Sequence, residues 1–395
     1  MSFPEQPSGG GIAPPPLLPL EGFTVAVTSD RRREELSTFF EKRGARVVSA
    51  PMIRIVPRTG GNELRQATEA CLAEPLDVLV VTTGIGFRGW MEAADGWGLG
   101  ERLRECLTSS ELIARGPKAR GAIRTAGLTE SWSPASESMS EVLDRLLAQD
   151  LQGRRIGVQL HGESLDDVVR ALEQAGALVT TIAAYDWLAP TDAAAAVRLV
   201  HAVAAGFVDG VVFTSAPAAA AMIALATEEG LDAELLEAFR RDVVVACVGP
   251  ICAVPFAGRD VDVVLPERAR LGSLIRSVVE EVPARRSIRL RLAGRCLEVR
   301  GHLVTLDGIP IELNPAPMAI LRELARVPGA VRTRDELAAR LPGDDSGPRG
   351  VEMTITRLRA MLGDPRLVET IVKRGYRLAC DVVEGHEEGL LALET

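Results

Sequence analysis

The sequence predicts an α/β protein in which a two-lobed body precedes a smaller basic module. Between residues 22 and 282, runs rich in Val and Ile alternate with helix-like stretches, a pattern typical of a parallel sheet covered on both faces. The segments 46–56 and 177–188 are longer than the other strands and follow helices that end in glycine, so we expect them to cross between two lobes. After residue 283 the pattern changes to short strands, three helices and a hairpin.

Length and composition restrict the class of protein. A chain of 395 residues with 47% hydrophobic and 25% charged residues is expected to form two or three globular domains. No apolar run reaches the roughly 18 residues of a membrane helix, and the N-terminus lacks a signal-peptide layout, so we expect a cytoplasmic protein without membrane contact. The six cysteines form no CxxC pair, which argues against a zinc site or a disulfide framework. We expect no metal and no cofactor.

The net charge of −9 argues against nucleic acid only as an average. Residues 284–380 hold 18 Arg and Lys against 11 Asp and Glu, a charge of +7, whereas residues 381–395 carry −5 and residues 1–283 carry −11. A basic module of this kind indicates contact with double-stranded DNA. The acidic tail 381–395 is either a solubilising segment or a competitor for the basic face.

The elements of the body are expected in alternating order. Residues 1–20, rich in Pro and Gly, are predicted to be a disordered leader, and residues 281–287 a linker. Strands are expected at 24–29, 46–55, 78–83, 121–125, 155–161, 177–185, 210–215, 243–248 and 261–265. Helices are expected at 34–43, 63–73, 137–148, 165–175, 193–204 and 269–280.

The module is expected to contain four short strands at 288–292, 296–299, 303–306 and 311–313, helices at 316–325, 334–340 and 349–362, and a hairpin over 367–378. In the helix 349–362, a stripe at 100° per residue should face the core; it comprises Val351, Ile355, Leu358 and Leu362. The opposite face carries arginines and small hydroxyl side chains, which suit a major groove; Lys373 and Arg374 at the hairpin turn could reach an adjacent backbone or minor groove. The alternative is an ordinary solvated helix face.

The stretch RGVEMTITRLRAMLGDPRLVETIVKRGYRLA resembles the winged helix-turn-helix domain of OmpR/PhoB-type response regulators. The resemblance implies that 349–362 is the recognition helix, that the hairpin is the wing, and that the protein binds direct repeats as a homodimer. Together with the hairpin turn, it gives eight candidate DNA contacts: Arg349, Met353, Thr354, Thr356, Arg357, Arg359, Lys373 and Arg374. Thr356 stands where the family commonly has a basic residue, which affects base preference.

The body lacks the acidic cluster and strand-end Asp of a phospho-acceptor domain, so we reject phosphorelay input. It resembles uroporphyrinogen-III synthase (HemD) in VAVTSDRRREELSTFFEKRGARVVSAPMIRIVP, DVLVVTTGIGF, GALVTTIAAYDWLAP, DGVVFTSAPA and VACVGPICA. The resemblance implies two flavodoxin-like lobes joined by a two-stranded ladder, with the active site in the cleft between them. The predicted limits are 21–283 for this body, with lobe one at about 22–48 plus 187–283 and lobe two at about 56–178, and 284–380 for the winged helix.

That family acts on a linear tetrapyrrole rich in carboxylates. Strand ends with Thr, Ser and Gly before helices offer free backbone N–H groups to such anions. The candidates are Thr82, Thr83, Gly84, Thr214, Ser215, Ala216 and Gly249, with ordinary helix capping as the alternative for each. Positive charge could come from Arg31, Arg54, Arg88 and Lys118, each of which could equally be solvated surface.

The resemblance makes Tyr185, on the ladder, the candidate to assist loss of the substrate hydroxyl; an interface aromatic is the alternative. His161 is a titratable residue near a strand end, and we expect it to have a structural role. At Ile251 and Cys252 the sequence departs from the threonines that synthases commonly carry, which puts catalysis in doubt.

The main hypothesis is therefore a transcriptional regulator with a synthase-like sensor or interaction module, similar to actinobacterial regulators of this architecture linked to nitrate and nitrite assimilation. The alternative is an active uroporphyrinogen-III synthase of tetrapyrrole biosynthesis with an appended DNA-binding domain.

Overall fold

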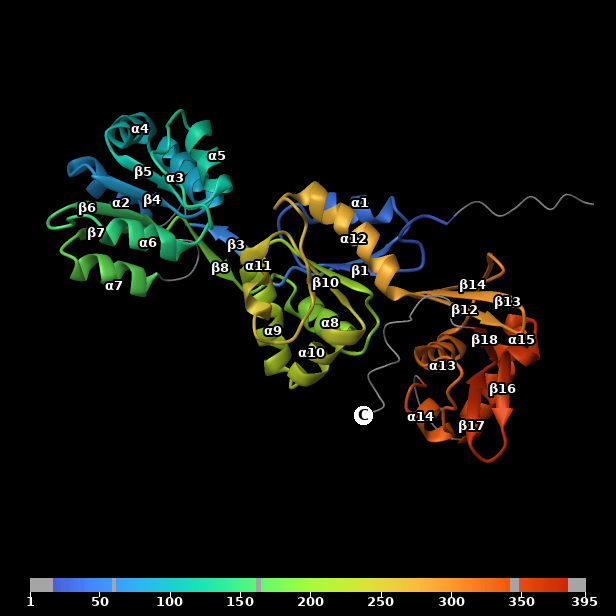
Figure 1. Cartoon of the computed structure of the whole chain (residues 1–395). Helices are drawn as coiled ribbons and strands as arrows, with labels where there is room; N and C mark the ends of the chain where they lie inside the picture. Colours follow the sequence, from blue (N-terminus) through green and yellow to red (C-terminus); the bar gives the residue numbers. More distant parts are fainter. Residues whose placement is uncertain (1–16, 59–61, 161–164, 342–347, 383–395) are drawn as a thin grey trace, which may run out of the picture. The chain divides into compact units, whose positions relative to one another are not determined.

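The computed structural model describes residues 17–58, 62–160, 165–341 and 348–382 (Figure 1). Backbone contacts divide the chain into two compact units. One unit runs to Ala50 and resumes at Ala194, so it contains lobe one and the C-terminal module; the other covers Pro51–Ala193 and contains the ladder and lobe two. Within the described residues, no helix has the length and apolar character needed to cross a membrane.

Lobe one is built on a five-stranded sheet in the order β11-β10-β9-β1-β2, in which every pair is parallel. Its strands are β1 (Thr24–Val27), β2 (Arg46–Ser49), β9 (Gly210–Phe213), β10 (Val244–Cys247) and β11 (Val263–Val264). Its helices are α1 (Arg33–Glu41), α8 (Ala193–Ala204), α9 (Ala216–Glu228), α10 (Asp232–Arg241), α11 (Pro250–Ala253) and α12 (Leu271–Arg286), and a 3-10 turn η1 spans Val254–Phe256. Strands β1, β9 and β10 are buried at every position, which explains their uninterrupted apolar sequences.

Lobe two has a four-stranded parallel sheet in the order β5-β4-β6-β7. Its strands are β4 (Val78–Val81), β5 (Glu111–Ala114), β6 (Arg155–Gln159) and β7 (Leu178–Ile182). Its helices are α2 (Asn62–Ala73), α3 (Gly84–Gly96), α4 (Gly100–Thr108), α5 (Pro117–Thr125), α6 (Met139–Leu147) and α7 (Asp166–Gln174). The fully buried Trp90 fixes α3 against α2, because its indole N–H donates to Thr68 Oγ1 at 2.8 Å.

The ladder consists of β3 (Arg54–Pro57) and β8 (Tyr185–Leu188), paired antiparallel with Arg54 opposite Leu188 (Figure 1). Each of the two predicted crossing segments contains two strands instead of one long strand. The first divides into β2 and β3 around Pro51, which lacks the N–H needed to continue pairing. The second divides into β7 and β8 after Ile182.

One predicted strand is wrong. Residues 121–125 form the end of helix α5, which begins with proline directly after Gly116, a favoured first helical position. The strand of that region is β5, which the sequence reading missed because only three apolar residues follow Glu111. A hydrogen bond from the Arg115 N–H to the Val81 carbonyl continues the alignment of β5 with β4.

The C-terminal module has an antiparallel sheet in the order β15-β14-β13-β12-β18, three helices and a separate hairpin. The sheet strands are β12 (Ser287–Leu292), β13 (Arg295–Arg300), β14 (Leu303–Leu306), β15 (Ile309–Ile311) and β18 (Cys380–Val382). The helices are α13 (Pro315–Arg326), α14 (Arg334–Ala338) and α15 (Pro348–Leu362), and the hairpin pairs β16 (Val368–Ile371) with β17 (Gly375–Leu378) after a 3-10 turn η2 at Pro365–Leu367. One buried cluster of leucines, isoleucines and valines joins the sheet, the helices and the hairpin.

The predicted linker is not a linker in the structure. Helix α12 continues through Pro283 to Arg286, and β12 begins at Ser287, so a helix of lobe one runs directly into the first strand of the module. The described part of the predicted leader is also structured, because Leu20 is fully buried and its N–H donates to the Arg43 carbonyl. Most of the predicted leader, His161 and nearly all of the acidic tail lie outside the described residues.

Candidate nucleic-acid interface and candidate ligand site

Helix α15 separates an apolar face from a basic face. The four residues of the predicted inner stripe are each at most 2% exposed, within the core of the module: Val351, Ile355, Leu358 and Leu362. On the opposite side Arg349, Thr356 and Arg357 are exposed, and Met353 exposes 58% of its surface. These four side chains are therefore presented to solvent as a recognition surface requires.

Two of the predicted DNA contacts are occupied within the module. Thr354 is 5% exposed, so it lies in the interior and not on the DNA-facing side. Its hydroxyl donates to the Gly350 carbonyl one helical turn earlier, as the exposed Thr356 hydroxyl does to the Glu352 carbonyl. Arg359 donates twice to the carbonyl of Val368, at 2.9 and 2.6 Å, and once to Thr370 Oγ1 at 2.8 Å. Arg359 thus ties the helix to the first strand of the wing, and we retain neither residue as a proposed DNA contact.

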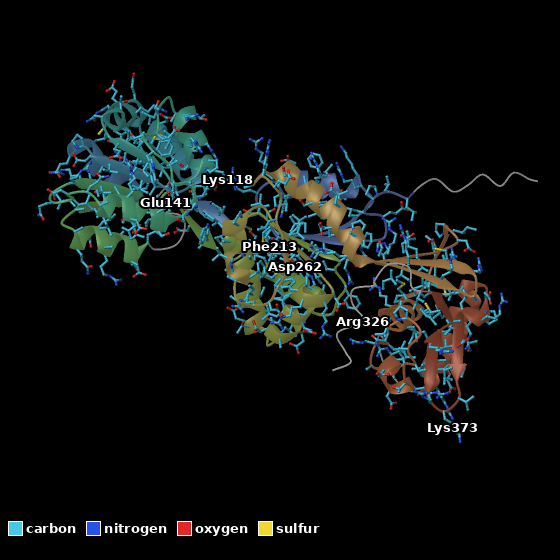
Figure 2. All side chains as sticks on the ribbon, in the orientation of Figure 1. Lys118, Glu141, Phe213, Asp262, Arg326 and Lys373 are labelled. Atoms are coloured by element: carbon cyan, nitrogen blue, oxygen red, sulfur yellow. The ribbon has the colours of Figure 1, made fainter. Side chains whose placement is uncertain are left out.

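The wing presents two further cations. At the turn between β16 and β17, Lys373 adopts a positive φ of 63°, and both Lys373 and Arg374 are exposed. Figure 2 shows Lys373 at the tip of the hairpin, with its side chain directed away from the strands. The preceding Val372 is 78% exposed. A tip that combines an apolar side chain with two cations can enter a groove or contact a phosphate.

The cations on α15 and the wing differ from most arginines of the module. Ion pairs join Arg295 to Asp307, Arg366 to Asp364 and Arg377 to Glu369, so these charges are largely balanced internally. By contrast, the side chains of four exposed residues have neither an ion pair nor a hydrogen bond with another described residue: Arg349, Arg357, Lys373 and Arg374. The unbalanced positive charge of the module is therefore gathered in part on the predicted DNA-facing elements.

The predicted ligand residues of lobe two lie together where β4 enters α3. Thr82 is buried and its hydroxyl donates to the Gln159 carbonyl at 2.7 Å. Thr83 caps α3, because its Oγ1 accepts the Gly86 N–H, and the same oxygen lies 3.2 Å from the Tyr185 hydroxyl. Thr83 therefore connects the helix N-terminus to the ladder tyrosine that was the candidate catalytic group.

Tyr185 is held in a protonated state suited to donation. Only 4% of its surface is exposed, and burial raises the pKa of its phenol above the ordinary value. The hydrogen bond with Thr83 and the positive charge of Arg115 oppose that rise without cancelling it. A neutral phenol next to a cation can donate a hydrogen bond to an oxygen of a bound ligand.

Sequence reasoning missed Arg115 and Gln159. Arg115 follows β5 and is mostly buried, which lowers the pKa of its guanidinium, while the group remains a cation at neutral pH. Gln159, at the end of β6, accepts the Thr83 N–H through Oε1 and donates through Nε2 to Thr83 Oγ1. Both stand at carboxyl ends of strands, the edge at which parallel sheets bind ligands. For Gln159 the predicted strand 155–161 gave that signal, whereas Arg115 follows β5, which the sequence did not predict.

Lobe one gathers its own predicted residues at the corresponding edge of its sheet. Thr214 and Ser215 lie between β9 and α9, and Ala216 is the first residue of α9; Ser215 is the N-cap, without a side-chain cap hydrogen bond. Gly249 follows β10 and precedes the four-residue helix α11. Ser29, just after β1, was also missed; its buried hydroxyl has no hydrogen-bond partner within the described structure.

The departure from synthases at residues 251 and 252 has a structural consequence. Ile251 is 37% exposed, whereas Cys252 is 4% exposed and lies close enough to the buried Cys247 thiol to hydrogen bond with it. Neither side chain supplies a hydroxyl to the carboxyl edge of lobe one. The four candidate cations of the body, Arg31, Arg54, Arg88 and Lys118, are exposed.

Comparison with known proteins decides the family of the body. The family model described as uroporphyrinogen-III synthase HemD matches residues 34–276. The chain belongs to the HemD family. It is similar to uroporphyrinogen-III synthase from Thermus thermophilus, with 28% identity, a TM-score of 0.54, and coverage of 66% of this chain and 100% of that chain. It is also 28% identical over 260 residues to the protein YjjA of Bacillus subtilis, covering 65% of this chain and 94% of that protein.

A second family model, for the C-terminal domain of transcriptional regulatory proteins, matches residues 308–378. The regulator TorR of Escherichia coli is 37% identical over 95 residues, which make up 23% of this chain and 41% of TorR. The chain thus spans less than half the length of that regulator. It is a HemD-family body fused to an OmpR/PhoB-type winged-helix DNA-binding domain, the architecture of a DNA-binding regulator.

Proposed function

We propose that this protein is a transcriptional regulator in which the HemD-family body serves as a sensor or interaction module for the winged helix. The observation that carries the proposal is the set of exposed cations on α15 and the wing whose side chains have no partner among the described residues, in a module whose other arginines are mostly paired. Charges left without an internal partner are available to phosphates, and arginines on a recognition helix can also read guanine. We propose Arg349, Met353, Thr356, Arg357, Lys373 and Arg374 as the DNA contacts.

The test is a titration of a fluorescent 30-base-pair duplex of mixed sequence with the full chain at several salt concentrations. Each phosphate contact contributes about 0.9 to the slope of log affinity against log salt, so exchanging Lys373 and Arg374 for alanine should reduce that slope by about 1.8. The matched control is Arg366→Ala, because Arg366 is exposed but paired with Asp364. Absence of binding at 50 mM salt, even after removal of residues 381–395, contradicts the proposal.

The ligand of the sensor is proposed from the edge of lobe two. Thr83, Tyr185 and Arg115 supply two hydroxyls and a mostly buried cation near a helix N-terminus, a combination suited to a carboxylate. Uroporphyrin III is a stable tetrapyrrole with several carboxylates and serves as the probe in calorimetry. Arg115→Ala should weaken its binding at least tenfold, whereas Arg124→Ala, which removes an exposed arginine paired with Glu130, should not.

The alternative is an active uroporphyrinogen-III synthase. It is favoured by the hydrogen bond between Thr83 and the ladder Tyr185, and disfavoured by Ile251 and the buried Cys252. Incubation with freshly made hydroxymethylbilane and separation of the isomers distinguishes the two functions. Type III product above the spontaneous type I background, lost in Tyr185→Phe, supports the synthase.

The regulated genes and the assembly on DNA remain predictions of the resemblance. A role in nitrate or nitrite assimilation predicts that deletion of the gene changes transcription of those pathway genes in cells moved to nitrate. Binding as a homodimer on direct repeats predicts two chains per duplex that carries two half-sites, measured by mass photometry.

A further inference from the structure

The amino-terminal edge of the lobe-one sheet carries a buried carboxylate. Asp209 immediately precedes β9 and is 4% exposed. Its Oδ2 accepts the N–H of Thr24, the first residue of β1, at 2.8 Å, and its Oδ1 lies 3.9 Å from Arg286 Nε. Asp209 therefore holds the amino ends of two adjacent strands and faces the last residue of α12, at the entrance to the DNA-binding domain.

A second carboxylate connects lobe one to that domain directly. Asp242, just after α10, accepts a hydrogen bond from Arg326 of α13 at 2.9 Å and lies 3.7 Å from Arg286 Nη1. Arg326 belongs to the winged helix, whereas Asp242 belongs to lobe one. The pair is partly shielded, since the two side chains are 35% and 30% exposed.

The turn between β13 and β14 fits against the start of lobe one. The His302 N–H donates to the Gly22 carbonyl at 2.8 Å, and Arg300 donates to the carbonyls of Pro19 and Leu18. Gly301 leaves no room for a side chain: a Cβ there would lie 2.3 Å from the Gly22 oxygen. We call this contact region the ionic junction and define it by Asp209, Asp242, Arg286, Arg300, His302 and Arg326.

The junction is polar, and some of its buried hydrogen-bond donors have no acceptor in the described structure. The Nε atoms of Arg286 and Arg300 are buried without a hydrogen-bond partner in the described structure. Burial raises the pKa of Asp209 above its ordinary value, against the opposing effects of the Thr24 N–H and of nearby cations. Buried charges with unmet hydrogen bonds stabilise a contact weakly, unlike the apolar packing within each domain.

We propose that the ionic junction is a releasable latch that docks the DNA-binding domain on lobe one. Because α12 runs into β12 without a loop, docking fixes the direction of the winged helix relative to the lobe-one sheet, and release leaves Ser287 as the pivot. The recognition surface takes no part in the latch: none of Arg349, Arg357 and Lys373 contacts the junction in the described structure. The latch controls where the recognition helix is held and leaves its DNA-facing side uncovered.

The position of the latch connects it with the candidate ligand edge of the same lobe. Thr24 and Asp209 stand at the amino ends of β1 and β9, and Ser29 and Thr214 stand beyond the carboxyl ends of the same two strands. Each strand is only four residues long. A ligand that shifts either strand at one edge therefore acts on the latch at the other.

The experiment measures hydrogen exchange at the His302 amide of the full chain, with fragmentation that resolves single residues. This amide bonds across the junction, so it is protected only while the domain is docked. The Asp307 amide, which bonds to the Cys296 carbonyl inside the winged helix, reports the fold of the domain itself. Asp242→Ala should speed exchange of the His302 amide about tenfold and leave the exchange rate of the Asp307 amide unchanged. Arg326→Glu should have a larger effect than Arg326→Ala, because it places a carboxylate opposite Asp242.

The matched control is Glu237→Ala, which removes an acidic residue of α10 whose ion pairs with described residues are those to Arg240 and Arg241 of the same helix. The wild-type chain allows a second measurement without any substitution. Raising the salt concentration from 0.1 to 1 M shortens the screening length from about 10 to 3 Å, and it should speed hydrogen exchange at the His302 amide but not at the Asp307 amide. Equal protection of His302 in wild type and Asp242→Ala, or loss of protection at Asp307 to the same extent, overturns the latch. No DNA or ligand is present, so the result is independent of the proposed function.

Discussion

Arg359 provides a test of whether the recognition helix uses its arginines for DNA or for its own wing. The side chain makes three hydrogen bonds to β16 and lies 6.0 Å from the ring centre of Tyr376 on β17. Hydrogen bonds from a charged donor contribute about 1.5–3 kcal/mol each when shielded, and partial exposure of this arginine reduces the total. We therefore expect Arg359→Ala to lower the free energy of unfolding of the winged helix by about 2 kcal/mol.

The four tryptophans, Trp90, Trp97, Trp132 and Trp187, all belong to the unit that contains lobe two, so tryptophan fluorescence does not report on the winged helix. Native-state hydrogen exchange at core amides of α15, such as Leu358, measures its stability instead. A loss of 2 kcal/mol corresponds to exchange about thirtyfold faster. Arg357→Ala serves as the matched control, because Arg357 is exposed on the same helix without a described partner, and should change exchange less than threefold.

The salt dependence of DNA binding separates the two roles. Arg357→Ala should reduce the slope of log affinity against log salt by about 0.9, the contribution of one phosphate contact, whereas Arg359→Ala should leave the slope almost unchanged. If Arg359→Ala has normal core exchange and a reduced slope, Arg359 contacts DNA as the helical pattern predicted, and the structural argument is refuted.

Three further predictions concern single groups. Ellman's reagent at pH 8 should react rapidly with the exposed Cys296 and not with Cys71, whose pKa burial raises to about 12; retention of the fast phase in Cys296→Ser contradicts this. Gly375→Ala should destabilise the winged helix by at least about 2 kcal/mol, because the residue has a φ of +143° and a Cβ would lie 1.9 Å from the Arg332 oxygen; unchanged exchange at core amides of α15 would falsify this. The absorbance difference between wild type and Tyr185→Phe should show the Tyr185 phenol ionising above pH 10.0, because burial raises its pKa. The stability that the neutral phenol contributes to the folded chain is complete below pH 10.0 and is lost as the pH rises through the pKa of the folded state. Ionisation near or below pH 10.0 contradicts this burial.

Local sequence patterns predicted most elements of the fold because burial imposes a readable composition. Strands β1, β4, β9 and β10 are buried on both faces, so they appear as short Val-rich runs. Helix α15 has one buried stripe, so its period of 3.6 residues identified Val351, Ile355, Leu358 and Leu362 as inward-facing, although it placed the buried Thr354 on the outer side. The patterns failed at residues 121–125, where an apolar stretch of helix α5 was taken for a strand; short apolar stretches do not distinguish a buried helix from a buried strand.

The candidate sites were predicted less completely because they depend on partners far apart in the chain. Thr83 and Tyr185 are 102 positions apart, yet their hydroxyls lie 3.2 Å from each other. Arg115 and Gln159 join the same site from two other strands and carry no motif of their own. Ser29 lies beyond the end of β1, and no local pattern shows that its hydroxyl is buried without a partner in the described structure.

The sequence by itself determined the class of both parts: an α/β body of two lobes, a basic winged helix, and a charge of +7 in the module within an acidic chain. It also determined which face of α15 points outward, because helical period depends only on neighbours in the chain. The tertiary structure decided which cations remain available on that face, because Arg359 finds acceptors on the first strand of the wing. It also replaced the predicted linker with a continuous helix and strand beside Asp209 and Asp242. Such contacts depend on residues brought together by folding, and no local pattern encodes them.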